Sequence, residues 1–219
     1  MQAKTLYLDT NDAQDANWIA EFDSNVGWAR NSAYGSDDQS WMFKRHAGFD
    51  VVAYKGDGVA GKQIPHSLGK TPEMVWVKQR SAASSWVVWH KGLNGGTNSY
   101  NYHILLDTNG TEVDDGSAGT QKFHSATPPT STMVSVGGSS WTNADDSDHI
   151  MMLFASVSGI SKVGYYAGSN TGQTITTGFQ PRFVLIKLID VTQEDWIVLD
   201  TLRGWGSGND NRLHLNAQT

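Results

Sequence analysis

The sequence predicts an all-β protein, with antiparallel β-sandwich lobes of jelly-roll or lectin-like type that come from an internal repeat of about 110 residues. Three observations predict this fold. Short apolar runs alternate with glycine-rich and polar turns, no window keeps helical apolar spacing over three turns, and one pattern of residues occurs twice. Composition agrees, because 23 glycines, 5 prolines and 17% charged residues suit a turn-rich β protein.

The repeated pattern has its parts in a fixed order. An aromatic residue comes first, then a polar residue followed by isoleucine, a proline, an apolar strand that ends in lysine, and a second strand that a tryptophan opens. In the first copy these parts are Tyr54, Gln63-Ile64, Pro72, Met74–Lys78 and Trp86–His90; in the second they are Tyr166, Thr174-Ile175, Pro181, Phe183–Lys187 and Trp196–Asp200. A fixed spacing indicates a chain built from one structural unit.

Flanking segments extend the repeat in both directions. The matching pairs are Trp41-Met42-Phe43 with Met152-Leu153-Phe154, Leu8–Asn11 with Leu106–Asn109, and Tyr102–Asp107 with Asn211–Asn216. The repeat therefore divides the chain into an N-terminal half-unit (1–40), a first whole β-sandwich unit (41–158) and the front half of a second unit (159–219). Residues 1–40, or residues outside this chain, are expected to complete the second unit. We predict that residues 6–43 pair with residues 165–216, within one chain or between neighbouring chains.

The expected elements follow from local composition. Residues 12–20 favour a helical turn or two, and Pro72 opens a near-continuous apolar run at 74–78 that suits a central strand buried on both faces. Residues 81–85 form a turn, after which residues 86–90 return antiparallel. The other expected strands are 41–43, 50–54, 63–64, 102–106, 132–136 and 149–155. Long polar loops at 91–101, 107–121 and 203–211 are the candidate contact surfaces.

Charge and residue usage exclude several classes of protein. The net charge is −6 and no basic cluster exceeds Lys44-Arg45, so nucleic-acid binding lacks its electrostatic requirement. No stretch approaches the roughly 20 apolar residues of a membrane helix, which argues against membrane insertion. Because there is no cysteine, disulfides, cysteine zinc sites and thiol nucleophiles are absent. No apolar segment follows Met1, which predicts synthesis in the cytoplasm without a signal peptide.

Two motifs resemble ligand-binding loops. Gly56–Gly61 reads GxGxxG, but the sequence behind it cannot open the helix that a dinucleotide site needs, so we interpret it as a hairpin turn. The candidate calcium ligands are Asp107, Asn109, Asp114 and Asp115. Position twelve of that loop is Ala118, where an EF-hand needs glutamate. Asx turns are therefore the favoured interpretation, with loosely bound Ca²⁺ as the alternative.

No catalytic constellation is present, and we predict no enzymatic activity and no cofactor. The histidines show neither HxH nor HExxH spacing, there is no GxSxG elbow, and no pair of carboxylates stands out. The nine tryptophans are expected to lie mostly in the core. If a sugar or a partner is bound, the predicted contact residues are Trp89, Trp205, Asn209 and Asp210.

Several blocks, in order, resemble a repeated β domain of tailed-bacteriophage structural and tail-fibre-like proteins. The blocks are Phe49–Tyr54, Ile64–Gly69, Pro72–Lys78, Leu153–Val157, Pro181–Lys187, Trp196–Gly204 and Ser207–Asp210. The resemblance implies a virion protein, either a tail fibre or another tail-associated or host-adhesion component. A capsid decoration protein, a carbohydrate-binding module and a depolymerase are the alternatives, in that order. The expected partners are other virion proteins, a host surface glycan and further copies of the chain, with a trimer favoured.

Overall fold

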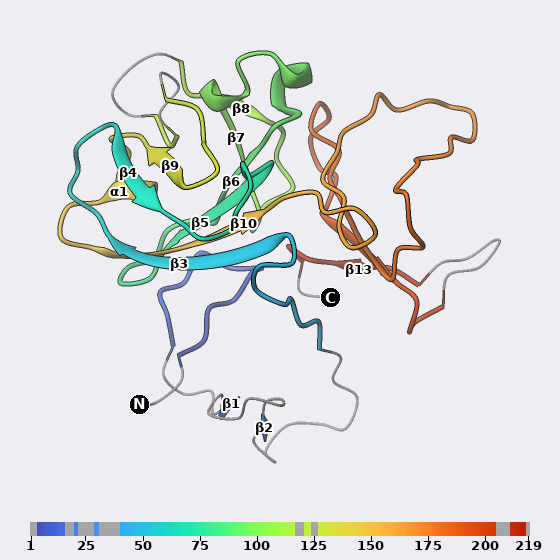
Figure 1. The fold of residues 1–219 in the computed structure, drawn as a ribbon, viewed down its shortest axis with the longest axis horizontal. Helices are drawn as coiled ribbons and strands as arrows, with labels where there is room; N and C mark the ends of the chain where they lie inside the picture. Colours follow the sequence, from blue (N-terminus) through green and yellow to red (C-terminus); the bar gives the residue numbers. More distant parts are fainter. Residues whose placement is uncertain are drawn as a thin grey trace.

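The computed structural model describes residues 4–15, 20–21, 29–30, 40–116, 121–123, 127–204 and 211–217. Over these residues the protein is all-β, as predicted, and every pair of strands is antiparallel (Figure 1). Helical structure in the same ranges is limited to one α-helix, α1 (Ser140–Asn143), and two 3₁₀ turns, η1 (Leu93–Gly96) and η2 (Ser99–Asn101). None of these helices has the length and apolar character that a bilayer crossing requires.

A six-stranded sheet contains most of the core. Its order is β3-β10-β5-β6-β7-β8, which are Phe49–Lys55, Asp148–Phe154, Met74–Gln79, Val87–His90, Tyr102–Leu105 and Val113–Asp114. Strand β5 pairs with β10 on one side and β6 on the other, and its residues from Val75 to Lys78 are all buried. The near-continuous apolar run at this strand is explained by that position, because both of its faces are covered. The predicted central strand is confirmed.

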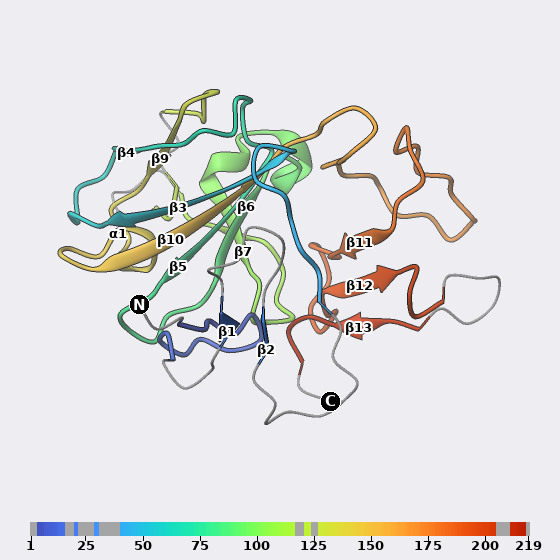
Figure 2. The ribbon, with the colours of Figure 1, turned by 60° about the horizontal axis from the view of Figure 1, so that its bottom comes forward.

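A smaller pair of strands covers one side of this sheet. Strands β4 (Lys62–Pro65) and β9 (Met133–Val136) pair with each other, and Figures 1 and 2 place them on the same side of the large sheet. Ile64 lies opposite Val134, and each is 1% exposed within the common core. The strands β3 and β4 therefore belong to different sheets. The glycine segment between them is a turn with positive φ at Gly58 and Gly61, but it is not the hairpin that we predicted.

A separate three-stranded sheet lies beside the large one (Figure 2). It has the order β11-β12-β13, which are Phe183–Ile186, Ile197–Asp200 and Leu213–His214. Trp196 and Val198 are buried, whereas all of β11 is only half-buried. The remaining described strands, β1 (Ala20–Glu21) and β2 (Ala29–Arg30), pair with each other near the N-terminus.

Three local expectations fail in the described residues. The strand expected at 41–43 does not form, because no described neighbouring strand pairs with these residues. Residues 12–15 form no helical turn, because Asp15 instead makes a β-bridge with Thr5, and residues 16–19 lie outside the described ranges. Thr174-Ile175, the counterpart of β4, forms no strand. Ile175 is 50% exposed, because no described strand covers it in the way that β9 covers Ile64.

Candidate functional site

The indole of Trp86 joins the N-terminal segment to the large sheet. Trp86 is 1% exposed, and its Nε1–H donates to the main-chain carbonyl of Tyr7 over 2.7 Å. Its own main-chain N–H donates to the Asp107 carboxylate over 3.1 Å, and its carbonyl accepts from Leu106 N–H over 3.0 Å. The tryptophan at the start of β6 is thus held by two segments that are far apart in the sequence.

Trp196 makes the same set of bonds beside the three-stranded sheet. It is 3% exposed, and its Nε1–H donates to the carbonyl of Leu105 over 2.9 Å. Its main-chain N–H donates to Asn216 Oδ1 over 2.7 Å, and its carbonyl accepts from Leu215 N–H over 2.8 Å. In the repeat, Leu105 corresponds to Tyr7, the indole acceptor of Trp86. Leu215 and Asn216 correspond in the same way to Leu106 and Asp107. We call the carbonyl-bearing segments around Tyr7 (residues 5–11) and Leu105 (residues 105–109) the first and second ledges.

The indole bonds to the ledges set these two tryptophans apart. In the described residues, the Nε1–H groups of Trp41, Trp76 and Trp89 are also buried, yet none of them has a hydrogen-bond partner. A buried donor that is satisfied stabilises the fold, whereas an unsatisfied one costs free energy. The bonds of Trp86 and Trp196 are therefore specific contacts. Only these two tryptophans occupy matching places in both copies of the pattern, which is the signal that sequence reasoning could have used.

A buried lysine reinforces the first ledge contact. Lys78 is 0% exposed, and its Nζ donates to the carbonyls of Ser84 and Asn11 over 2.6 and 3.1 Å. Burial lowers its pKa, while the carboxylates of Asp107 and Asp12 oppose that shift. The ammonium group thus ties the β5–β6 turn to the first ledge, and Ser84 N–H adds a 2.7 Å bond to Asn11 O.

Lys187 holds the equivalent turn before β12. Its Nζ donates to the carbonyls of Leu188 and Glu194 over 2.6 and 2.8 Å, and burial lowers its pKa. The N–H of Gln193 donates to the Asn109 carbonyl on the second ledge over 3.1 Å. The equivalent bond in the first copy runs from Ser84 N–H to the Asn11 carbonyl on the first ledge. Both turns therefore contact a ledge through their main chains.

The carboxylate of Asp50 is buried and fully engaged by donors. It accepts from Ser67 N–H over 2.8 Å, from Ser67 Oγ over 3.1 Å and from Val51 N–H over 2.9 Å, and it forms an ion pair with Arg45. Burial alone would raise the pKa of Asp50, but the bonds from Arg45, Ser67 and Val51 outweigh it and hold the pKa below its usual range. This carboxylate fastens the start of β3 to the segment after β4.

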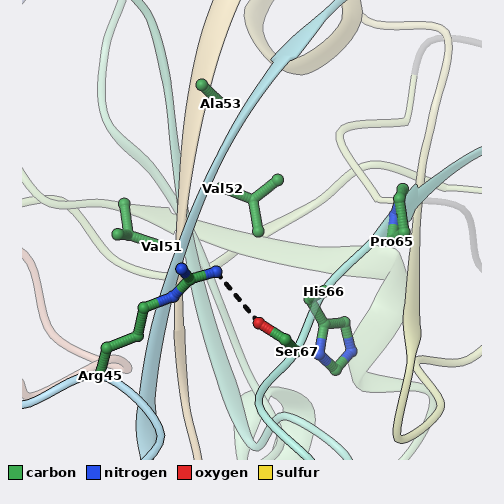
Figure 3. Close-up of a pocket in the computed structure, with 7 residues that line it drawn as sticks. All are labelled: Arg45, Val51, Val52, Ala53, Pro65, His66 and Ser67. Atoms are coloured by element: carbon green, nitrogen blue, oxygen red, sulfur yellow. Dashed lines mark hydrogen bonds between the residues drawn. The ribbon is translucent and has the colours of Figure 1, made fainter.

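Arg45 and Ser67, which bind that carboxylate, also line a surface hollow (Figure 3). Arg45, His66 and Ser67 bring polar groups to it, while Val51 and Val52 supply apolar lining. Arg45 Nη2 donates to Ser67 Oγ over 3.0 Å, and His66 Nε2 is bonded to the Thr130 carbonyl over 3.2 Å. Since these groups already bond to the protein, we assign no chemistry to the hollow.

The predicted calcium ligands are used separately by the protein. Asp107 accepts from Trp86 N–H, Asp114 accepts from Gly116 N–H over 2.7 Å, and the Asn109 carbonyl accepts from Gln193. Asp115 is paired with Lys122 over 2.8 Å and lies 3.1 Å from His103 Nδ1. Among the residues that the structure describes, no three metal-ligating side chains form a cluster. The bond at Asp114 is the Asx turn that the sequence favoured.

The predicted contact residues do not form one site. Trp89 is 2% exposed and stacks on Tyr100 at 4.8 Å, so its buried ring is a core group and not the exposed platform that we predicted. Trp205, Asn209 and Asp210 lie outside the described residues. Trp141 on α1, which sequence reasoning missed, is 37% exposed. Trp141 lies in a polar stretch that has no counterpart in the repeat, so the sequence did not indicate it as a contact residue.

The described residues form an all-β protein in which the buried indoles of Trp86 and Trp196 bond to main-chain carbonyls of distant segments. A family model described as "Domain of unknown function (DUF7483)" matches residues 4–219, and the chain belongs to that family. No curated protein and no solved structure shows significant similarity to the chain.

Proposed function

We propose that this protein is a structural component of a tailed-bacteriophage virion, a tail-fibre or host-adhesion protein without enzymatic activity. The observation that carries the proposal is the repeated docking of Trp86 on Tyr7 and of Trp196 on Leu105. A joint used twice with the same atoms lets one unit follow another in a defined orientation, as repeat proteins require. The resemblance of the sequence blocks to tail-fibre-like proteins supplies the virion context.

The proposal includes an internal repeat of about 110 residues, in which β5–β6–β7 and β11–β12–β13 are equivalent. Strand register supports it, since Met74 lies opposite His90 and Phe183 lies opposite Asp200, at positions that the sequence pattern pairs. We also infer that residues 41–158 form a β-sandwich of lectin-like type. The β4–β9 pair would be part of its second layer, with the common core between it and the six-stranded sheet.

The way in which buried charges are used favours a structural role. Asp50 and Lys78 are each held by groups of the protein itself. The Glu73 carboxylate is paired with Lys91 and accepts from Ser156 N–H over 2.6 Å, and these bonds outweigh burial and keep its pKa below the usual range. A catalytic acid or base needs a free position for its substrate. These groups instead fasten strands to one another.

A host glycan is the proposed ligand in an adhesion role, and Trp141 is the aromatic that we assign to it. Lys122 Nζ lies 5.0 Å from the centre of its ring and is itself paired with Asp115. His103 packs edge-on against the same ring, 6.3 Å away. An exposed indole offers a stacking face for a sugar ring.

Analytical ultracentrifugation of the purified chain, together with a glycan array on the same sample, tests the proposal. We expect a discrete trimer that binds at least one surface glycan. A monomer that binds no glycan would contradict a fibre or adhesin and would fit a capsid decoration protein. Immunogold labelling of intact phage particles with antibodies to the chain should mark the tail, and particles without label would contradict a virion role.

A further inference from the structure

Strand β11 has a partner on one side only. It pairs with β12, and within the described residues no strand lies along its other edge. Strand β5, its counterpart in the sequence pattern, is covered on that side by β10. An unpaired edge exposes a row of main-chain donors and acceptors that a further strand can bind.

The N-terminal segment already reaches this edge. Figures 1 and 2 show the blue segment that precedes β3 passing beside the three-stranded sheet. Trp41 and Phe43 pack edge-on against Phe183, with ring centres 5.8 and 5.9 Å apart. The Arg203 guanidinium lies 5.6 Å from the centre of the Trp41 ring. Side chains from the two ends of the chain therefore form one aromatic cluster.

The contacts match those of β10 with β5. Residues 41–43 correspond in sequence to residues 152–154 of β10, and Phe183 corresponds to Met74. In the six-stranded sheet Phe154 lies opposite Met74 and Met152 lies opposite Trp76. The same register would put Phe43 opposite Phe183, which is where the aromatic contact is found.

Both β11 and residues 42–43 leave apolar side chains partly exposed to solvent. Met42 is 74% exposed and Phe43 is 51% exposed, and every residue of β11 is only half-buried. The positions that β10 buries in β5, such as Val75 and Val77, are 0% exposed. Pairing would remove this surface from water, which favours association.

Residues 40–43 form no strand in this structure. We propose that they extend and pair with the outer edge of β11 in the same chain, with Phe43 opposite Phe183 and Trp41 opposite Leu185. Residues 40–43 and the C-terminal strands then form a single sheet. The same-chain assignment rests on the contacts of Trp41 and Phe43 with Phe183. This inference is independent of the virion role.

Paired cysteines test the register, because the chain has no cysteine of its own. We expect Phe43→Cys with Phe183→Cys to form an intramolecular disulfide in the monomer under mild oxidation, since opposite residues in a strand pair come within reach of one. The control is Met42→Cys with Phe183→Cys, in which the side chain at 42 points to the other face and should not cross-link. Disulfide-linked dimers, or equal cross-linking of both pairs, would overturn the proposal.

Hydrogen exchange on the unmodified chain provides a second test that does not depend on the variants. All amides of β11 should exchange slowly, including the alternate ones that point away from β12. Deletion of residues 1–43 should restore fast exchange at those alternate amides only. Fast exchange of the same amides in the intact chain would overturn the proposal.

Discussion

The indole N–H of Trp196 donates to the carbonyl oxygen of Leu105 over 2.9 Å, and this bond joins the three-stranded sheet to the last residue of β7. Trp86 makes the matching bond to Tyr7 over 2.7 Å. In both places a main-chain N–H from the turn before the indole donates to a carbonyl of the same ledge. The two contacts are therefore one kind of joint, built from a buried indole, the turn before it and a ledge.

Trp196→Phe should destabilise the protein by about 1–3 kcal/mol, because the carbonyl of Leu105 loses its donor while most of the ring volume is kept. Chemical denaturation followed by circular dichroism measures the change. Trp141→Phe is the matched control, since Trp141 is 37% exposed, and it should stay within about 0.5 kcal/mol of the original chain. Equal stability of the two variants would contradict the role of the joint.

Asp50→Ala should cost about 3 kcal/mol or more, because it leaves the donors of Ser67 and Val51 unpaired beside a buried site. Thermal or urea unfolding gives the value. Asp146→Ala removes an exposed ion pair with Lys55 and serves as the control, with an expected change below about 1 kcal/mol. If both variants unfold alike, Asp50 does not fasten β3.

Lowering the pH should reduce the free energy of unfolding through protonation of His90. Burial, helped by the charge of Lys91, lowers its pKa from 6.5 to about 4, and its Nδ1 accepts from Gly92 N–H over 2.9 Å. Between these two values the unfolded chain binds the proton more tightly than the folded one. Stability is therefore lost as the pH falls from about 6.5 to 4, by up to about 3 kcal/mol from this group.

The variant His90→Asn isolates that contribution. Asp200, the counterpart of His90, accepts from Leu202 N–H over 2.9 Å through a side-chain oxygen, so asparagine should keep the corresponding bond to Gly92. Urea unfolding at several pH values should show a smaller loss of stability in the variant. Parallel curves for both proteins would show that His90 does not titrate in this range.

Trp141→Ala should abolish binding of any glycan that the original chain recognises, without lowering its melting temperature by more than a few degrees. The exposed ring contributes little to the core, so a loss of binding would reflect contact with the sugar. Val59→Ala, also at an exposed apolar residue, is the control and should bind normally. Unchanged binding by the Trp141 variant would remove this residue from the contact surface.

The strands with clear apolar patterns could be predicted from sequence, and the way they assemble could not. The run at 74–78 identified a central strand because burial on both faces leaves a local signature. Strand β10 lies between β3 and β5, and this contact between distant segments leaves no local pattern in the sequence. Strand β8 was missed because Val113-Asp114 is short, exposed and set in a polar loop.

The candidate site shows the same limit. A tryptophan in a strand is recognisable, but its sequence does not say which face is covered, so Trp89 was assigned to the surface although η2 supplies Tyr100 to stack on it. Trp86 and Trp196 could be paired from the repeat. Their acceptors are main-chain carbonyls, which any residue can provide, and so Tyr7 and Leu105 could not be identified.

Exchange of the indole protons with solvent, followed by NMR, tests the ledge contact most directly. The Nε1–H signals of Trp86 and Trp196 should exchange far more slowly than that of the exposed Trp141. Deletion of residues 1–12 removes Tyr7 and should speed exchange at Trp86 while Trp196 keeps its protection. Exchange at Trp86 and Trp196 as fast as at Trp141, or protection of Trp86 that survives the deletion, would contradict the account.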